Sequence, residues 1–313
     1  MTISIAATTA ARRRNPNRPV WEEPPSAAGQ AGKGAVLVVI LLAILVPLWS
    51  VVITSLSSQA AINTAGGMVL IPGDLTVNAY DAILRGGPVA RALVVSLGIT
   101  AVGTLFSMVI SVLCAYGLSR KGSLGHRTIL MLLIVTMFVS AGLIPSYLVV
   151  VGAGGYDQYW ALIVPSAVNV FNIIVLRAFY AGTATELIDA ARMDGASEWR
   201  ILWSVVLPTS RAVTAVVTLF YAVGYWNSFF NVMLYMPLDS RKWPLQYVLY
   251  QYVSLGFNMP GQTNSGFGSG QSQTAPLSLQ MAVVVLTLLP VVIAFPFLQK
   301  HLAKGMLTGA IKG

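Results

Sequence analysis

Charged side chains are scarce in this sequence of 313 residues. Asp, Glu, Lys and Arg make up 9% of it, whereas an average soluble domain contains about a quarter. Hydrophobic residues make up 56%, and the mean hydropathy is +0.74. The composition excludes an ordinary soluble domain and makes a lipid bilayer the expected solvent. The net charge of +9 does not indicate a nucleic-acid partner, because the charges separate uncharged runs instead of gathering on one polar surface.

Cysteine and histidine are almost absent. The single cysteine, Cys114, lies inside an uncharged run without a partner for a disulfide or a metal site, so we interpret it as a packing residue. The two histidines, His126 and His301, lie in separate segments. No H-E-x-x-H or G-x-S-x-G pattern occurs, and "GLSRKGS" at Gly117–Ser123 has a serine where a phosphate-binding loop needs lysine. We therefore expect no metal, no cofactor, no catalytic group and no ATPase site in this chain.

Long apolar runs, by contrast, are abundant. A helix needs about 20 apolar residues to cross a hydrocarbon core of about 30 Å. Six runs of roughly this length contain no Lys, Arg, Asp or Glu, so none would bury a charge at the bilayer centre. The sequence therefore predicts an all-α integral membrane protein with six transmembrane helices. The runs are Ala35–Leu56, Ala92–Leu118, Ile129–Val151, Tyr159–Leu176, Ala212–Tyr235 and Leu279–Leu298.

The segment ahead of the first run, residues 1–34, contains three consecutive arginines and is similar to the charged region of a secretory signal peptide. The run that follows is 22 residues long, and no small-residue cleavage pattern comes after it. We interpret this run as a retained transmembrane helix and residues 1–34 as a flexible tail.

Lys and Arg are unevenly distributed over the segments between the runs, and positively charged loops face the cytoplasm. Four alternate segments contain 15 of the 19 Lys and Arg residues, and three others contain the remaining four. We therefore expect both termini to be cytoplasmic, residues 35–298 to form the six-helix domain, and residues 299–313 to form a cytoplasmic tail. The rich segments are 1–34, 119–128, 177–211 and 299–313, and the poor ones are 57–91, 152–158 and 236–278.

Two segments expected on the outer side have distinct compositions. Residues 57–91 mix polar and apolar side chains with Gly and Pro, which favours a short folded piece over a linker. Residues 256–275, within the expected periplasmic loop 236–278, are rich in Gly, Ser, Gln and Asn. Their composition alone favours a flexible tether.

A charge-dense stretch between the fourth and fifth runs reads "DAARMDGASEWRILWSVVLP", from Asp189 to Pro208, with five charged residues. It predicts two short helices, because Gly195 fits the left-handed position that ends the first and Ser197 can cap the second. Small residues beside an acid could let another protein approach closely. The same helix could instead be an amphipathic cover of the bundle, and the residues alone leave both interpretations open.

The spacing of this stretch resembles the EAA loop of permease subunits in bacterial binding-protein-dependent (type I) ABC importers. The family pattern is glutamate-alanine-alanine, then glycine, then isoleucine-x-leucine-proline. Here Asp189 replaces the glutamate and Val205 the isoleucine, and both substitutions keep the chemistry. The phrases "GGYDQYWALIVPSAVNVFNIIVLRAFY", "YAVGYWNSFF" and "FPFLQKHLAKGMLTGAIKG" resemble the carbohydrate-importing branch, in particular the maltose-type second permease and its polysaccharide-fragment relatives. The resemblance covers about residues 35–313.

The resemblance implies the type I ABC importer permease fold in the bacterial cytoplasmic (inner) membrane. It implies transport of a sugar, as an oligosaccharide or polysaccharide fragment, from an extracytoplasmic sugar-binding protein to the cytoplasm. The implied partners are a second homologous permease subunit in a heterodimer, that binding protein, membrane lipid, and two separate ATPase subunits that bind ATP and Mg²⁺. The loop 185–208 would be the coupling helix that seats in the ATPase, with Glu186 or Asp189 as its acidic anchor. The implied coupling residues are Glu186, Asp189, Ala190, Ala191, Asp194, Gly195, Leu207 and Pro208.

Polar and aromatic residues of the fourth and fifth runs are candidates for a sugar pathway, because aromatic faces stack on sugar rings and amides bond to hydroxyls. Asn227 and Asn231 lie four apart and are expected to share one helix face. The alternative is structural, since buried Asn ties helices together and Trp or Tyr anchors spans. The candidates are Asn169, Asn172, Tyr225, Trp226, Asn227 and Asn231.

The C-terminal tail contains Lys300, Lys304 and Lys312, which attraction to anionic lipid would explain. The family resemblance also implies that this tail contacts the ATPase, with Gly309 and Lys312 as candidates.

A stand-alone six-helix channel or secondary carrier is the alternative function. An ion-coupled carrier usually needs an acid or base at mid-membrane, and none of the six runs contains one. No internal repeat is visible either, so an inverted-repeat carrier gains no support.

Overall fold

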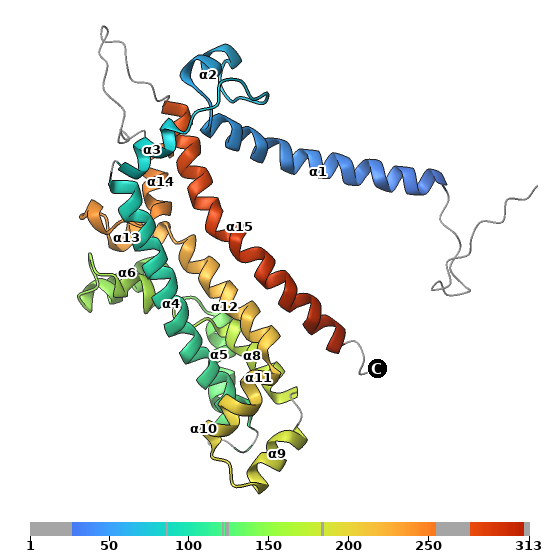
Figure 1. The fold of residues 1–313 in the computed structure, drawn as a ribbon. Coiled ribbons are helices and arrows are strands. Elements are labelled where there is room, and N and C mark those ends of the chain that lie inside the picture. Colours follow the sequence, from blue (N-terminus) through green and yellow to red (C-terminus); the bar gives the residue numbers. More distant parts are fainter. Residues whose placement is uncertain are drawn as a thin grey trace, which may run out of the picture. The chain divides into compact units, whose positions relative to one another are not determined.

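The computed structural model describes residues 27–85, 87–120, 122, 125–182, 185–254 and 276–309. This part of the chain is mainly helical (Figure 1). It contains no β-strand beyond one isolated antiparallel bridge between Ser57 and Leu75. The chain divides into two units, residues 1–49 and 50–313, and each is described by itself.

The helices are α1 Ala27–Ser55, α2 Gln59–Ala65, α3 Asn78–Arg85, α4 Pro88–Ser119, α5 His126–Phe138, α6 Leu143–Gly152, α7 Trp160–Ile163, α8 Val170–Gly182, α9 Thr185–Met193, α10 Glu198–Ile201, the π-helical turn η1 Leu202–Val206, α11 Leu207–Thr209, α12 Arg211–Trp226, α13 Phe230–Tyr235, the 3₁₀ turn η2 Ser240–Lys242, α14 Leu245–Ser254 and α15 Pro276–Gly309.

The first unit contains most of α1, which begins eight residues before the apolar run predicted from Ala35. Its large apolar side chains between Val36 and Leu48 are exposed around the whole circumference of the helix. A helix that is apolar on all sides is stable in lipid or among other helices, not in water. The exposure therefore agrees with the predicted transmembrane helix.

Three helices of the described residues are long and apolar enough to cross a membrane, and three bent pairs raise the number of candidate spans to six. The long ones are α1, α4 and α15, which contain the first, second and sixth predicted runs. These runs became continuous helices because nothing inside them prevents helical hydrogen bonding except the prolines of α1 and α15, which membrane helices tolerate.

The third predicted run, Ile129–Val151, is not one helix. α5 ends at Phe138, α6 starts at Leu143, and the two are bent by 116°. Gly142 lies between them with φ of 80°, a conformation that side chains other than glycine rarely adopt. This run is therefore a bent candidate span and not one continuous helix.

The fourth and fifth predicted runs are also broken. In Tyr159–Leu176, α7 ends at Ile163 and α8 starts only at Val170, since Pro165 lacks the amide that would continue α7. In Ala212–Tyr235, α12 ends at Trp226 and a separate helix, α13, follows. Three of the six predicted runs are therefore continuous helices, and three are interrupted.

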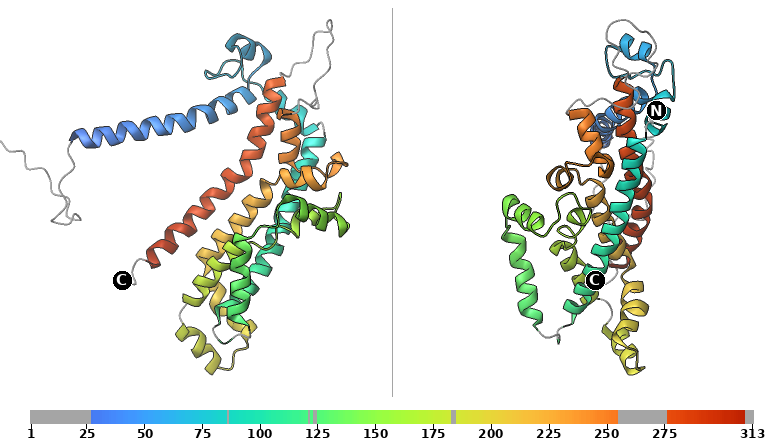
Figure 2. Two further views of the ribbon diagram at one scale, coloured as in Figure 1. Left: turned by 180° about the vertical axis from the view of Figure 1, so that it is seen from behind. Right: turned by 90° about the vertical axis from the view of Figure 1, so that its left-hand side faces the viewer.

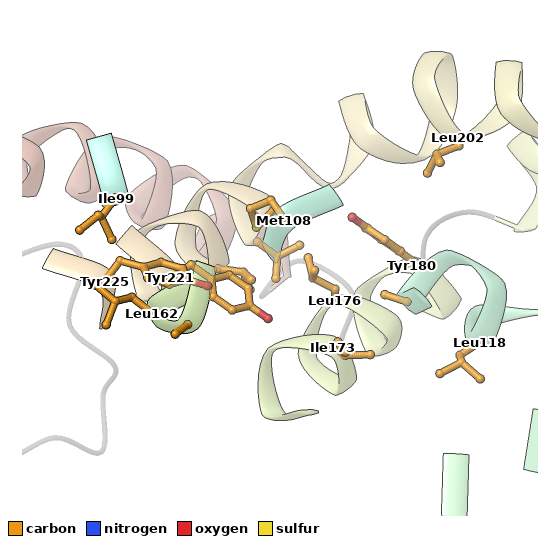
Figure 3. Close-up of a cluster of buried hydrophobic side chains, with 14 of the residues drawn as sticks. Ile99, Met108, Leu118, Leu162, Ile173, Leu176, Tyr180, Leu202, Tyr221 and Tyr225 are labelled. Carbon is orange, nitrogen blue, oxygen red and sulfur yellow. The ribbon is translucent and has the colours of Figure 1, made fainter. Parts of the chain in front are cut away.

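The core of the second unit lies where α4 packs against α8 and α12, and α12 also packs against α15 (Figures 1 and 2). Figure 3 shows the centre of this cluster, with side chains from all three packed helices and from the segment after α10. The labelled members are Ile99, Met108 and Leu118 of α4, Leu162 of α7, Ile173, Leu176 and Tyr180 of α8, Leu202 of η1, and Tyr221 and Tyr225 of α12.

Hydroxyl groups connect α4 to α12 inside this core. The Ser107 and Tyr225 hydroxyls lie 2.8 Å apart, and those of Ser111 and Tyr221 lie 2.7 Å apart. Such interhelical hydrogen bonds stabilise packing where the helices gain little from leaving lipid. Gly103 permits the close approach, because a Cβ atom there would lie 2.8 Å from Cζ of the Tyr225 ring.

Residues 57–91 form a folded piece, which confirms the expectation from their composition. The Thr76 amide donates to the Leu56 carbonyl at 2.6 Å, and the Ser58 amide donates to the Asp74 carbonyl at 3.1 Å. The following helix, α3, packs against α4 and α15 and buries Ile83 completely.

We predict that Gly103→Ala destabilises the protein, because the new methyl group meets the Tyr225 ring. Overpacking of this kind costs about 1–3 kcal/mol. Gly98→Ala on the same helix is the matched control, since a Cβ there meets nothing within 4 Å. The melting temperature in detergent should fall for Gly103→Ala and stay level or rise for Gly98→Ala. Equal melting temperatures would show that the α4–α12 contact is looser than described.

Candidate functional site

The loop between α8 and α12 folds as two helices hinged at a glycine, as predicted. After α9 ends at Met193, Gly195 adopts φ of +76° and its amide donates to the Arg192 carbonyl at 2.9 Å. The Ser197 hydroxyl then caps α10 by accepting a hydrogen bond from the Arg200 amide. The second helix continues through η1 and α11 and meets α12 at a bend of 88°.

The loop has a buried apolar face. Ile188 of α9, Ile201 of α10 and the η1 residues Leu202 and Val206 belong to the main core cluster. Together they seat the loop against the ends of α4 and α8, where Leu118 and Tyr180 lie in the same cluster (Figure 3). The loop is therefore part of the packed bundle and not a free appendage.

The opposite face of the loop exposes large apolar side chains. Met193 is 89% exposed, Trp199 62% and Trp203 64%. Exposed aromatic side chains in one short segment are typical of protein or membrane contact surfaces.

The Glu198 carboxylate of α10 accepts hydrogen bonds from charged and polar side chains of other segments. Glu198 Oε2 accepts hydrogen bonds from the Tyr116 hydroxyl and from Arg120 Nη2, the latter at 3.0 Å. Glu198 Oε1 accepts two from the Arg192 guanidinium, at 3.2 and 3.1 Å. Arg120 also donates to the Tyr116 hydroxyl, and its guanidinium carbon lies 4.7 Å from the centre of that ring. The hydrogen bond from Tyr116, helped by the two arginines, lowers the pKa of the Glu198 carboxyl on this loop.

The predicted coupling residues take different positions in the loop. Asp189 is exposed and lies 3.5 Å from Arg192, one turn away on α9. Ala190 and Asp194 are exposed, whereas Ala191 packs partly against the core. Leu207 and Pro208 are half-buried in α11, and Glu186 is a residue of α9 whose side chain lies outside the described part.

A cavity of about 380 Å³ lies among α8, α12 and α13. This is within the usual size range of small-molecule sites. Four of the six predicted pathway residues meet in it, together with the buried Ser228 hydroxyl, which has no hydrogen-bond partner among the described residues. The ten lining residues carry no charge: Ser166, Asn169, Phe171, Asn172, Phe220, Tyr221, Gly224, Tyr225, Ser228 and Asn231.

Hydrogen bonds fix the polar wall of this cavity. The Tyr221 hydroxyl accepts from the Asn169 amide at 3.2 Å, and Asn169 Oδ1 accepts from the Asn172 amide at 3.1 Å. The Tyr225 hydroxyl donates to the Ile163 carbonyl at 3.0 Å. The two tyrosines therefore connect the cavity wall to the serines of α4.

Two predicted pathway residues are not among the residues that line the cavity. Trp226 is buried in a second cluster and donates its indole N–H to the Thr287 carbonyl of α15 at 3.0 Å. Asn227 is exposed at the end of α12 and accepts a weak hydrogen bond from Gln246. Because α12 ends before Asn227 and α13 starts at Phe230, Asn227 and Asn231 do not share a helix face, and that prediction was wrong.

Sequence reasoning missed several lining residues. Tyr221 could have been found, because it lies four residues before Tyr225 and so shares its helix face. Ser166, Phe171, Phe220 and Ser228 carry no comparable pattern, since only the tertiary contacts bring them together.

The first half of the expected outer loop 236–278 is packed. Lys242 Nζ lies 2.8 Å from Asp157 Oδ2 and also donates to the Asp157 carbonyl oxygen, which joins two segments far apart in the sequence. The hydrogen bond to Asp157 raises the pKa of the Lys242 ammonium. The Trp243 indole N–H donates to the Met236 carbonyl at 2.9 Å. The tether proposed for 256–275 lies outside the described residues.

The C-terminal candidates are described only in part. Gly309 is the last residue of α15, and Lys312 lies outside the described residues. Across the described chain, no group of three or more His, Cys, Asp or Glu side chains could hold a metal ion.

Comparison with known proteins identifies the family. Residues 107–308 match the family described as "Binding-protein-dependent transport system inner membrane component". This match covers more than half of the chain. The chain belongs to this family of permeases. The resemblance stated from the sequence is thereby confirmed.

Individual relatives are similar over most of their length. The polygalacturonan/rhamnogalacturonan transport system permease of Bacillus subtilis (strain 168) is 42% identical over 78% of this chain and 85% of its own. The trehalose transport system permease of Mycobacterium tuberculosis (strain CDC 1551 / Oshkosh) is 27% identical over 87% and 93%. The crystal structure of a bacterial ABC transporter involved in the import of the acidic polysaccharide alginate superposes on 89% of this chain and 99% of that chain, with a TM-score of 0.79 and 26% identity.

Membership has direct consequences. The chain has the ABC importer permease fold and is a multi-pass component of the bacterial inner membrane. It is a transport subunit and not itself catalytic. Dependence on a binding protein and on an ATPase follows from the same family.

We predict that Gly195→Ala loosens the loop locally, because alanine in a left-handed conformation costs about 1–2 kcal/mol. Tryptic cleavage after Arg192 in detergent should become about fivefold faster or more, since local opening exposes the chain. Gly182→Ala is the control, because that glycine ends α8 without a positive φ and with open space around it. Cleavage at the native rate in Gly195→Ala would contradict the hinge.

Proposed function

We propose that the chain is the permease subunit of an ABC importer that moves a sugar, as an oligosaccharide or polysaccharide fragment, from an extracytoplasmic binding protein to the cytoplasm. The observation that carries the proposal is the family match over residues 107–308. Its sugar substrate is supported by relatives named for polygalacturonan/rhamnogalacturonan, trehalose and arabinooligosaccharides. The likeness to the alginate importer adds a polysaccharide case.

The proposed orientation places both termini and the loop 185–208 in the cytoplasm. The distribution of Lys and Arg supports it, since the segments on that side carry 15 of the 19. Residues 57–91, 152–158 and 236–278 then face the binding protein. Residues 1–34 and 299–313 are the proposed cytoplasmic tails, and 35–298 the permease domain.

The loop is the proposed contact with the ATPase. It offers an acid on α9, Asp189, and the exposed aromatic side chains Trp199 and Trp203 on one short segment. Its buried face belongs to the same apolar cluster as α4 and α8, so a force on the exposed face can reach the bundle through packed side chains. Gly309 and Lys312 are proposed as a second contact of the ATPase with the C-terminal tail.

The proposed assembly contains a second homologous permease, two ATPase subunits that bind ATP and Mg²⁺, and the sugar-binding protein. The broad apolar exposure of α1 and α5 supports further protein or lipid neighbours, because such surfaces are not stable in water.

The cavity among α8, α12 and α13 is the proposed contact with the sugar. Tyr and Phe faces can stack on rings, and Asn amides and Ser hydroxyls can bond to sugar hydroxyls. None of its described lining residues is cationic. This wall therefore recognises rings and hydroxyls, and it supplies no charge to neutralise a carboxylate.

For the loop, we predict that Asp189→Lys lowers the amount of co-expressed ATPase subunit that copurifies with the permease by at least about tenfold, because reversing a charge in an interface costs several kcal/mol. The control is Asp81→Lys on α3. Asp81 is likewise exposed and paired with an arginine of its own helix, at 2.7 Å, but α3 lies near the opposite end of α4 from the loop (Figure 1). Undiminished ATPase on the Asp189→Lys permease would contradict the proposed contact.

For the cavity, we predict that Asn231→Leu lowers uptake of a neutral oligosaccharide into proteoliposomes by about tenfold, the effect of losing one or two hydrogen bonds. ATPase copurification should not change. Asn227→Leu is the control, because Asn227 lies four residues away but does not line the cavity. If the two variants transport equally well, this cavity is not on the sugar pathway.

A further inference from the structure

Glu198 connects three segments of the chain through one carboxylate. Tyr116 lies in the last turn of α4 and Arg120 is the C-cap of that helix. Arg192 belongs to α9, and Glu198 itself opens α10. Both carboxylate oxygens are used, one toward α4 and the other toward α9. The loop and the end of α4 are therefore linked at defined atoms in addition to their apolar contact.

These two kinds of contact constrain different motions. The apolar seat of Ile188, Ile201 and Leu202 holds the loop on the bundle, but hydrophobic contact has no preferred direction. Hydrogen bonds do have one, because they weaken steeply away from linear geometry. We therefore expect the carboxylate to define the angle of α9 and α10 relative to α4 more sharply than the apolar seat does alone.

The small contribution that exposed ion pairs make to stability is consistent with an orienting role for Glu198. Exposed ion pairs contribute little to stability, and the side chain of Glu198 is 56% exposed. The apolar seat is buried, so we expect the loop to stay folded without this carboxylate. A change at Glu198 is therefore expected to alter how the loop moves with α4 more than whether the protein folds.

We propose that Glu198 is a positioning residue that joins the α9–α10 loop to the end of α4, so that movement of the loop is passed to α4 as a unit. The inference rests on the proposed role of the loop as the ATPase contact. It adds that Glu198 acts inward, through Tyr116 and Arg120, and not by touching the ATPase.

The test compares Glu198→Gln, Arg120→Gln and the double variant in the full assembly, reconstituted in proteoliposomes with the binding protein and its sugar. The quantity measured is the sugar transported per ATP hydrolysed. Each single variant should lower it by about fivefold or more, the lower range of coupling between linked sites. The double variant should lose no more than either single one, because both remove the same connection. Copurified ATPase should stay at the native amount.

Arg200→Gln is the matched control, because Arg200 is an exposed charged residue two positions along α10 without a described side-chain partner in this network. It should keep the native ratio of transport to hydrolysis. If Glu198→Gln fails to reach the membrane, Tyr116→Phe removes a single hydroxyl from the network and should give the same loss.

Three results would overturn the proposal: a native ratio in Glu198→Gln or Tyr116→Phe, losses that multiply in the double variant, or loss of ATPase from Glu198→Gln. The last would make Glu198 a direct ATPase contact. Failure of the proposed function is recognised separately, because it would appear as undiminished ATPase on the Asp189→Lys permease.

Discussion

The close contact between α4 and α12 is the constraint on which the rest of the second unit depends. Gly103 leaves room for the Tyr225 ring, and the serines of α4 bond to both tyrosine hydroxyls of α12. In a bilayer, helices gain little from leaving lipid, so such packing and hydrogen bonds hold them together. The same tyrosines line the cavity and bond to the backbone at Asn169 and Ile163. One set of contacts therefore fixes the helix packing and the shape of the cavity at once.

The sequence predicted those parts of the structure that depend on residues close together in the chain. The helix–glycine–helix form of the loop follows from Gly195 and Ser197, whose backbone requirements do not depend on distant residues. The spans in α4 and α15 follow from charge-free length alone. The family resemblance began with the same loop, because the spacing of its small, acidic and glycine residues can be recognised in the sequence alone.

What the sequence did not predict depends on contacts between distant residues. The breaks in the third to fifth runs occur near Gly142, Pro165 and Asn227, yet Pro47 and Pro290 lie inside continuous helices. A proline or glycine therefore marks only a position where a helix can break. Contacts with neighbouring helices determine whether it does. The cavity is even harder to predict from the sequence, since the hydrogen bond between Ser107 and Tyr225 joins residues 118 positions apart. The break after Trp226 separated Asn227 from Asn231, which periodicity alone had placed on one face.

The position of α4 explains how the loop and the cavity can act together. Tyr116, at its loop end, lies nine residues from Ser107, which bonds to the cavity residue Tyr225; this is about 14 Å along a helix. Beyond its first residue α4 contains no proline, so its hydrogen bonds run without interruption between these two points. The bent pairs α5–α6 and α11–α12, by contrast, have breaks that can absorb a change of angle. Under the proposed coupling, a rotation imposed at Glu198 therefore reaches the tyrosines of the cavity through a stiff helix, while the broken spans adjust around it.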